Sequence, residues 1–268
     1  MKALIASALV AHLPLAHAGV FYEMSSRNLT AVGAKPVLTR EYAQDGRVRE
    51  EEGEGSSSVV ITTAQALITI NTSARSYQLM DEETLTRVGA RERASHDKDV
   101  AQRARLPANV REMLDRVDED TQEALAMEKK PLDYRATDRH EVVAGFSCSI
   151  WEYYWRGGKE AEYCIAEPAS IPGGAEWMAA LQAEGDFYTN AGQWLGDPAR
   201  LLFASVLPQV EAPSRLHGIP LMFRTFRRGK AVSETRVTSE RIEPLNPDLF
   251  VVPKGYERQP AEPARPGG

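Results

Sequence analysis

The sequence predicts an α+β protein in which helices cover one face of an antiparallel β-sheet. Short segments rich in β-branched and aromatic residues recur before residue 81 and again after residue 133, with turn residues between them. A long charged segment at about residues 81–130 separates the two groups and has the composition of helices. The mature chain has a length that such folds often build as one domain, so we expect a single domain over residues 19–257.

The first 18 residues have the features of a cleavable signal peptide. Lys2 supplies a positive start, residues 3–15 form a short apolar run, and residues 16–18 form a small-x-small cleavage site. The run is shorter than the roughly 20 apolar residues that span a bilayer, and His12 and Pro14 interrupt it. We therefore expect cleavage after Ala18 and a periplasmic or secreted protein that does not span the membrane.

The segments after the signal peptide read as a meander of short strands. These segments are residues 21–24, 37–42, 59–63, 66–70 and 76–80. The segment Gln44-Asp-Gly-Arg47 predicts a turn after the strand at residues 37–42, since Asp-Gly tolerates a positive φ. The acidic run at residues 50–54 is expected to be a solvated loop.

The charged segment at about residues 81–130 is expected to form a helical insertion. Its second half opens with Pro107 and carries apolar residues at helical spacing. These are Val110, Met113, Leu114, Val117, Thr121 and Leu125. We expect this narrow apolar stripe to lie over one face of the sheet, and the more polar first half, at residues 83–104, to be exposed.

The chain contains two cysteines, Cys148 and Cys164, which flank a glycine turn. In an oxidising compartment such a pair is expected to form a disulfide across a β-hairpin. If the cysteines are directly opposed, the turn is centred on Arg156 and has three or five residues.

The same register sorts the hairpin side chains by alternation. One face carries Trp151, Tyr153, Trp155, Ala161, Tyr163 and Ile165, and the other carries Cys148, Cys164, Glu152, Glu160 and Glu162. We expect the aromatic face to be covered and the cysteine face to lie nearer water.

The remaining segments predict two short helices, further strands and a loose tail. The helices are expected at residues 175–184 and 198–207, and the strands at residues 134–143, 219–226, 232–243 and 248–256. The tail at residues 258–268 is rich in proline and polar residues and is expected to be disordered.

Composition excludes one class of partner. The formal net charge of the chain is −6, with 38 acidic and 32 basic residues. A net-acidic surface lacks the positive charge that supplies most non-specific affinity for nucleic acid. We therefore expect no nucleic-acid partner.

Several short sequence segments resemble those of a known superfamily. They are the strand-turn-strand at residues 66–80, the Gly145-Phe-Ser-Cys148 start, Gly218-Ile-Pro-Leu221, and the ending Leu249-Phe-Val-Val-Pro-Lys-Gly-Tyr256. Over about residues 20–256 the chain resembles uncharacterised exported bacterial domains related to the LolA-like lipoprotein-carrier superfamily. The resemblance implies a strongly curved antiparallel half-barrel whose concave face is closed by helices, with acyl chains carried between the layers in the best-known members.

A half-barrel of this kind would have an apolar cleft between the sheet and its helical cover. Our candidates for ligand-binding residues are Trp151, Tyr153, Trp155, Tyr163 and Ile165 on the sheet, with Val110, Met113, Leu114 and Val117 on the cover. The alternative is that these residues are core, with no space between sheet and helix, because apolar alternation mostly reports burial.

No catalytic, metal-binding or cofactor motif stands out in the sequence. Ser147 lacks the second glycine of a nucleophile elbow, and His96, His140 and His217 stand alone. We therefore expect a non-enzymatic periplasmic protein without a cofactor that binds a lipid or other apolar small molecule, with a carrier role at the cell envelope. One alternative is a structural or interaction module with an envelope protein partner. A hydrolase would require His140 or His217 to meet a serine and an acid in space.

Overall fold

The computed structural model describes residues 19–261 except for residues 32, 54–56, 104, 129–131, 198 and 201–206. The side chains of residues 118, 120–128 and 207 are likewise not described. The predicted signal peptide and residues 262–268 of the predicted tail lie outside this range, as do the side chains of Thr121 and Leu125.

The described strands form one 12-stranded sheet in the order β12-β6-β5-β4-β3-β2-β1-β11-β10-β9-β8-β7. The first six are β1 (Gly19–Asn28), β2 (Val37–Gln44), β3 (Arg47–Glu52), β4 (Ser58–Thr63), β5 (Ala66–Asn71) and β6 (Ser76–Asp81). The others are β7 (Asp133–Val143), β8 (Phe146–Trp155), β9 (Gly158–Ala166), β10 (Ile219–Arg227), β11 (Lys230–Glu243) and β12 (Glu257–Arg258). Neighbours pair antiparallel except β12, which runs parallel to β6.

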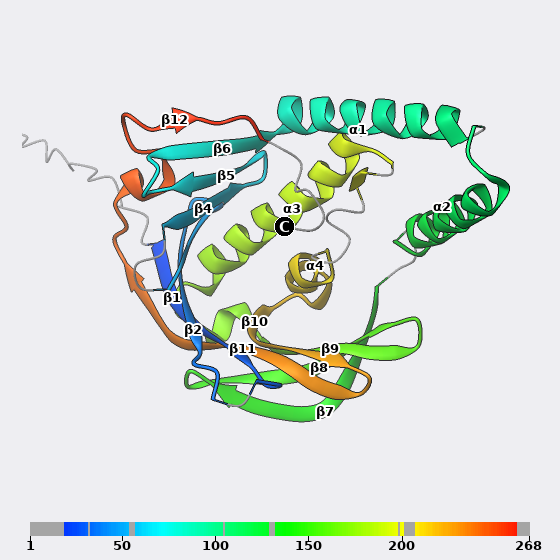
Figure 1. The fold of residues 1–268 in the computed structure, drawn as a ribbon. Coiled ribbons are helices and arrows are strands. Elements are labelled where there is room, and N and C mark those ends of the chain that lie inside the picture. Colours follow the sequence, from blue (N-terminus) through cyan, green and yellow to red (C-terminus); the bar gives the residue numbers. More distant parts are fainter. Residues whose placement is uncertain are drawn as a thin grey trace, which may run out of the picture.

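The sheet is strongly curved, and Figure 1 shows two helices inside its concave side. They are α3 (Gly174–Leu195) and α4 (Leu207–Leu216). Two short 3-10 helices, η1 (Pro168–Ser170) and η3 (Pro247–Phe250), lie in connecting segments. This arrangement confirms the predicted α+β class, with a curved antiparallel sheet whose concave face is covered by helices.

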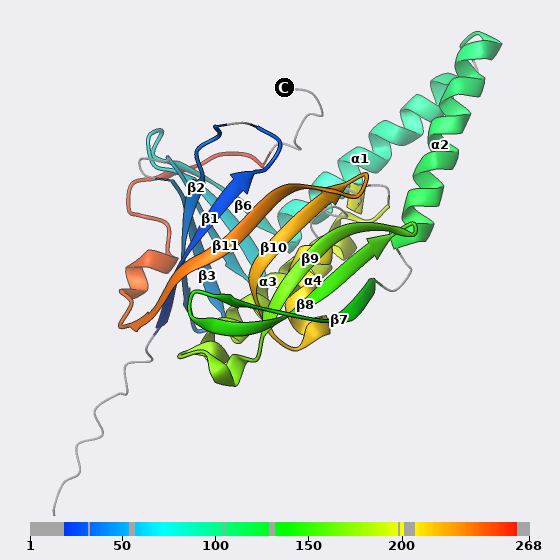
Figure 2. The same ribbon diagram turned by 90° about the horizontal axis from the view of Figure 1, so that it is seen from below.

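The helical insertion consists of α1 (Glu82–Arg103) and α2 (Ala108–Glu128) and connects β6 to β7. Gly89 of α1 packs so closely on α3 that a Cβ added there would lie 2.0 Å from the Leu195 carbonyl oxygen. Figures 1 and 2 show that α2 projects away from the sheet. In the described part of the chain, no helix is both long and apolar enough to cross a membrane.

The helical cover therefore differs from the predicted one. The predicted stripe on α2 leaves Met113 and Val117 each 53% exposed, whereas Trp177 and Phe187 of α3 are 1% and 0% exposed. A stripe of medium-sized side chains between charged faces buries less apolar area than the aromatic face of α3. The concave face is thus covered by α3 and α4.

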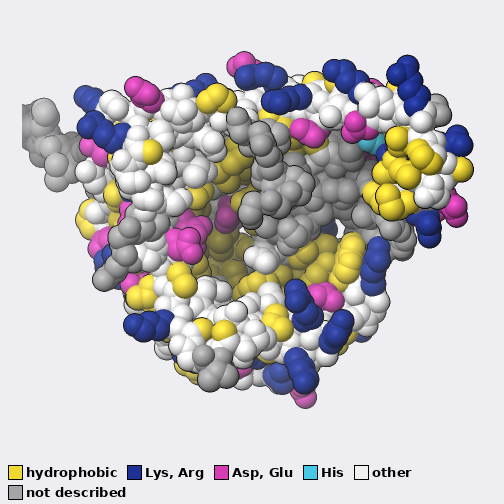
Figure 3. Space-filling model, in the orientation of Figure 1, with side chains coloured by type: hydrophobic (Ala, Val, Ile, Leu, Met, Phe, Trp, Pro, Cys, Tyr) yellow, Lys and Arg dark blue, Asp and Glu magenta, His cyan; other side chains and the backbone are white. Residues whose placement is uncertain are grey.

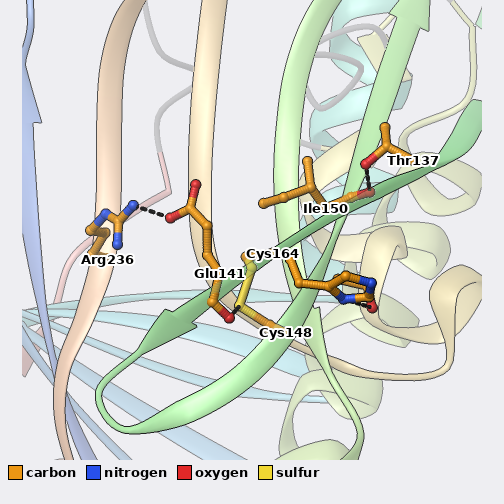
Figure 4. Close-up of a disulfide and its surroundings, with 8 residues drawn as sticks. Thr137, Glu141, Cys148, Ile150, Cys164 and Arg236 are labelled. Atoms are coloured by element: carbon orange, nitrogen blue, oxygen red, sulfur yellow. Dashed lines mark hydrogen bonds and ion pairs between the residues drawn. A yellow bond between two sulfur atoms is a disulfide. The ribbon is translucent and has the colours of Figure 1, made fainter.

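The disulfide between Cys148 and Cys164 is present, but its register differs from the predicted one (Figure 4). Cys164 lies opposite Ile150, and Trp151 lies opposite Tyr163, so the cysteines are offset diagonally. The turn has two residues, Arg156 and Gly157, with φ values of 50° and 79°. This is the geometry of a tight hairpin turn, and a bulge between Tyr153 and Tyr154 shifts the register beyond it.

The two faces of this hairpin separate as alternation predicts, but both are buried around the cysteines. Tyr153, Tyr163 and Ile165 are buried and pack against Ala212 of α4. The expectation that the cysteine face lies nearer water is wrong, because Cys148 and Cys164 are 3% and 0% exposed.

Sheet curvature explains the burial of the cysteine face. Glu141 of β7 pairs with Arg236 of β11 at 2.5 Å, although these strands are not neighbours in the sheet order (Figure 4). The β7 strand therefore reaches across the outer side of the sheet at the level of the disulfide.

Two shorter segments also differ from the sequence prediction. The acidic residues Glu50, Glu51 and Glu52 end strand β3 instead of forming a loop, and Arg49 pairs with Glu51 at 2.6 Å. The expected strand at 248–256 is replaced by η3 and a turn before β12. Asn246 caps η3 by accepting a hydrogen bond from the Asp248 backbone N–H, which favours the helical turn over a strand.

Candidate functional site

A cavity of about 210 Å³ lies between the concave face of the sheet and helices α3 and α4. Figure 3 shows the hollowed face, with hydrophobic side chains gathered inside it. The sheet contributes Tyr22, Met24, Glu41, Tyr163, Pro220, Leu221, Met222, Phe223, Thr235 and Val237. The helices contribute Trp177, Leu181, Glu184, Gln209, Val210 and Pro213.

The periodicities of helix and strand explain why these side chains face the cavity. Trp177, Leu181 and Glu184 follow the i, i+4, i+7 spacing of a single face of α3. Thr235 and Val237 are two apart on β11, as residues on one face of a strand must be. The cavity is thus bounded by one face of α3, by α4 and by the concave side of the sheet.

Two tyrosines fix α4 to the sheet at the far wall. The hydroxyl groups of Tyr134 and Tyr163 donate to the Pro208 carbonyl oxygen at 2.5 and 3.1 Å. This carbonyl belongs to the first turn of α4 and accepts both bonds. The helix is therefore held in place by polar contacts as well as by its apolar face.

One end of the cavity is polar and is built around Tyr22. The Tyr22 hydroxyl donates a hydrogen bond to the Glu41 carboxylate, and both side chains are buried. The Tyr22 ring stacks on Trp177 with centroids 4.0 Å apart. Burial and the nearby Glu50 raise the pKa of Glu41, while its hydrogen bond with Tyr22 acts in the opposite direction. The indole N–H of Trp177 is also buried and makes no hydrogen bond of normal geometry to the described residues.

Glu184 adds a second carboxyl to this end. Its side chain is half-buried, and burial, reinforced by the charge of Glu50, raises its pKa to about 7. Glu50 itself has a raised pKa because it is half-buried and lies near Glu52. Among the described residues that line the cavity there is no Lys, Arg or His. The site is therefore an apolar cavity with an acidic end.

Replacing Glu184 with glutamine should stabilise the protein at pH 8 but not at pH 4. The folded-state pKa of about 7 lies above the ordinary value, so the folded state binds the proton more tightly and native stability falls as pH rises through this interval. Because solvent screens the half-buried side chain, we expect a gain of only about 2 kcal/mol at pH 8.

Urea denaturation of both proteins at the two pH values measures this gain. The matched control is Asp186→Asn, which removes an exposed charge from the same helix outside the cavity. Equal gains for Glu184→Gln at pH 4 and pH 8 would contradict the assignment.

The structure brings the five predicted sheet residues together in one apolar cluster, but not with the predicted residues on the cover. Tyr163 lines the cavity, whereas Tyr153 and Ile165 pack beneath α4 with Trp151 and Trp155 at the edge of the same cluster. The predicted residues on the cover, Val110, Met113, Leu114 and Val117, lie on the projecting helix α2.

Sequence reasoning missed Tyr22, Trp177, Glu41 and Glu184. The sequence held one signal for the cavity-facing side of α3. Trp177 and Leu181 lie four residues apart in a segment that is expected to be helical, so they share one helix face. The acids gave no signal, since a glutamate that ends up in a cavity looks the same in sequence as one on the surface.

A serine and a histidine do meet on the sheet, but without an acid. The Ser149 hydroxyl lies 3.2 Å from Nδ1 of His140, on paired strands at an exposed position. Within the described residues no carboxylate hydrogen-bonds to His140, so a serine–histidine–acid arrangement is not completed there. The described residues also contain no group of three or more His, Cys, Asp or Glu placed to hold a metal ion.

Comparison with solved structures finds chains of low sequence identity. An uncharacterised conserved protein from Thermus thermophilus is 11% identical, with a TM-score of 0.44 and 91% of each chain covered. The structure of PNGF-II is 8% identical with a TM-score of 0.39, and the match covers 91% of this chain and 31% of that one. MucB from a Pseudomonas aeruginosa MucA/MucB complex is 12% identical with a TM-score of 0.37, over 87% of this chain and 55% of that one. No protein-family model and no curated protein sequence matches this chain.

Proposed function

We propose that this protein is a non-enzymatic binding protein that holds a lipid or other apolar ligand between its curved sheet and helices α3 and α4. The observation that carries the proposal is the apolar cavity of about 210 Å³ at that interface. Ligand sites are typically concave and largely apolar, with a few polar groups that fix orientation. With the predicted export signal, this supports a carrier role at the cell envelope.

The apolar walls of the cavity favour an apolar ligand. The cavity opens to the surface, so water fills it when no ligand is bound. Moving an apolar ligand out of water into such a site gains about 25 cal/mol per Å² of apolar surface that is buried.

The Leu181→Trp variant tests the proposal because a larger side chain on α3 would fill the cavity. Titration with the neutral fluorescent probe N-phenyl-1-naphthylamine should show saturable binding to the native protein. The variant should bind at least about 10-fold more weakly, a loss of about 1.4 kcal/mol. The control Val142→Trp places the same side chain on β7 at a position that is 69% exposed, and should bind the probe normally.

An interaction module is the second candidate, and the same titration separates it from the first. Its support is the projecting α1–α2 pair, on which Val100, Leu106 and Met113 are 45%, 37% and 53% exposed. Figure 3 shows hydrophobic side chains gathered at this end of the molecule, and contiguous exposed apolar patches mark surfaces that other proteins cover. Absence of saturable probe binding to the native protein would remove the binding-protein proposal and leave this one.

A further inference from the structure

We infer that the ligand of this cavity is a cationic amphiphile, with its apolar body between α3 and the sheet and an amine or quaternary ammonium group at the acidic end. This inference rests on the proposed binding function and specifies the charge of the ligand. The carboxylate of Glu184 would receive the cation, beside the buried Glu41 carboxyl and the aromatic rings of Tyr22 and Trp177.

The charges around the cavity decide between a cationic and an anionic head group. Glu41 and Glu184 line the cavity, Glu50 lies close enough to act on both, and the described lining contains no basic side chain. The ionised Glu184 carboxylate would repel a carboxylate head group and would attract an ammonium group.

The aromatic residues at the same end favour the same sign of charge. Tyr22 and Trp177 both line the cavity and stack on each other with centroids 4.0 Å apart. The face of an aromatic ring attracts cations, most strongly for tryptophan. The stacked faces of Tyr22 and Trp177 cover each other, so a cation at this end would meet only the ring surfaces that border the cavity.

The remaining walls suit the body of such a ligand. Leu221 and Val237 of the sheet are buried and face Leu181 and Val210 across the cavity. The volume of about 210 Å³ is below that of typical drug-sized pockets, so a short alkyl chain is the appropriate probe. Head-group charge can then be varied while the chain is kept constant.

Isothermal titration calorimetry with three octyl ligands tests the inference at pH 8, where Glu184 is ionised. Octyltrimethylammonium should bind at least about 10-fold more tightly than octan-1-ol, and octanoate should bind more weakly than octan-1-ol. Glu184→Gln should lower the ratio of octyltrimethylammonium affinity to octan-1-ol affinity by about 10-fold. Asp186→Asn, which removes an exposed charge from the same helix, should leave both affinities unchanged.

The possible outcomes separate this inference from the binding function. If octanoate or octan-1-ol binds as tightly as the cation, the inference is overturned while the binding function stands. If Asp186→Asn weakens cation binding as much as Glu184→Gln does, the preference comes from overall surface charge and the inference is overturned. If none of the three ligands binds but N-phenyl-1-naphthylamine binds saturably, the inference is overturned and the binding function stands, and if neither the octyl ligands nor this probe binds, both are overturned.

Discussion

Glu162→Ala is expected to lower the free energy of unfolding by about 3 kcal/mol, the lower end of the range for breaking a buried ion pair. The Glu162 side chain is 2% exposed and accepts hydrogen bonds from Arg139 at 2.6 Å, Lys159 at 2.9 Å and Arg224 at 2.9 Å. Removing the carboxylate leaves three cations, on β7, β9 and β10, clustered on the outer face of the sheet with only Glu152 and Glu234 to balance them. We take the lower end because the side chain of Arg139 is 48% exposed and can rehydrate.

Urea denaturation at pH 7 measures this loss, and its pH dependence provides a second readout. Burial acts to raise the pKa of Glu162, but hydrogen bonds from Arg139 and Lys159 lower it overall. A lowered pKa means that the stabilisation is present above the unfolded-state pKa and is lost as pH falls through the folded-state pKa. The two proteins should therefore converge in strong acid. Glu160→Ala, an exposed substitution on the same strand, should cost less than about 0.5 kcal/mol, and an equal loss in both variants would refute the prediction.

Removal of the disulfide by the double change Cys148→Ala and Cys164→Ala is expected to cost about 3 kcal/mol. The two cysteines are separated by 16 positions, and closing a loop of about 15 residues removes roughly this much entropy from the unfolded chain. Both side chains are buried in the core cluster with Ile150 and Val143, so the loss is not offset by solvation.

Guanidinium denaturation without reductant measures the effect of the double change. Reduction of the unfolded native protein before refolding should reproduce most of the loss. A free energy of unfolding within about 0.5 kcal/mol of the native value would show that the disulfide adds no stability.

The sequence predicted which side chains share a face of the cysteine hairpin, but not the register in which its two strands pair. Alternation along residues 151–165 identified the aromatic face correctly, because side chains on a strand must alternate. The turn was misjudged because a two-residue turn requires positive φ at Arg156, a residue type that does not signal one. The bulge at Tyr153 and Tyr154 then allows diagonal cysteines to bond.

The site was less predictable because its polar residues come together only in three dimensions. Glu41 and Glu50 lie on the paired strands β2 and β3, and Glu184 reaches them from α3 on the other side of the cavity. Neither helical nor strand periodicity marks a carboxylate as buried. The helix that covers the sheet was also predicted wrongly. The narrow apolar stripe of α2 gives a clear helical pattern in the sequence, whereas the aromatic residues of α3 are spread along 22 residues and give a weaker one.

A crystal structure with a bromine-labelled ligand tests the central claim most directly. Crystals would be soaked with the tightest-binding octyl ligand carrying bromine at its terminal carbon, at a concentration above its dissociation constant. We predict an anomalous bromine peak inside the cavity, among Leu181, Leu221 and Val237, with the head group toward Glu184. A peak found only outside this cavity, for example along α2, would contradict the account.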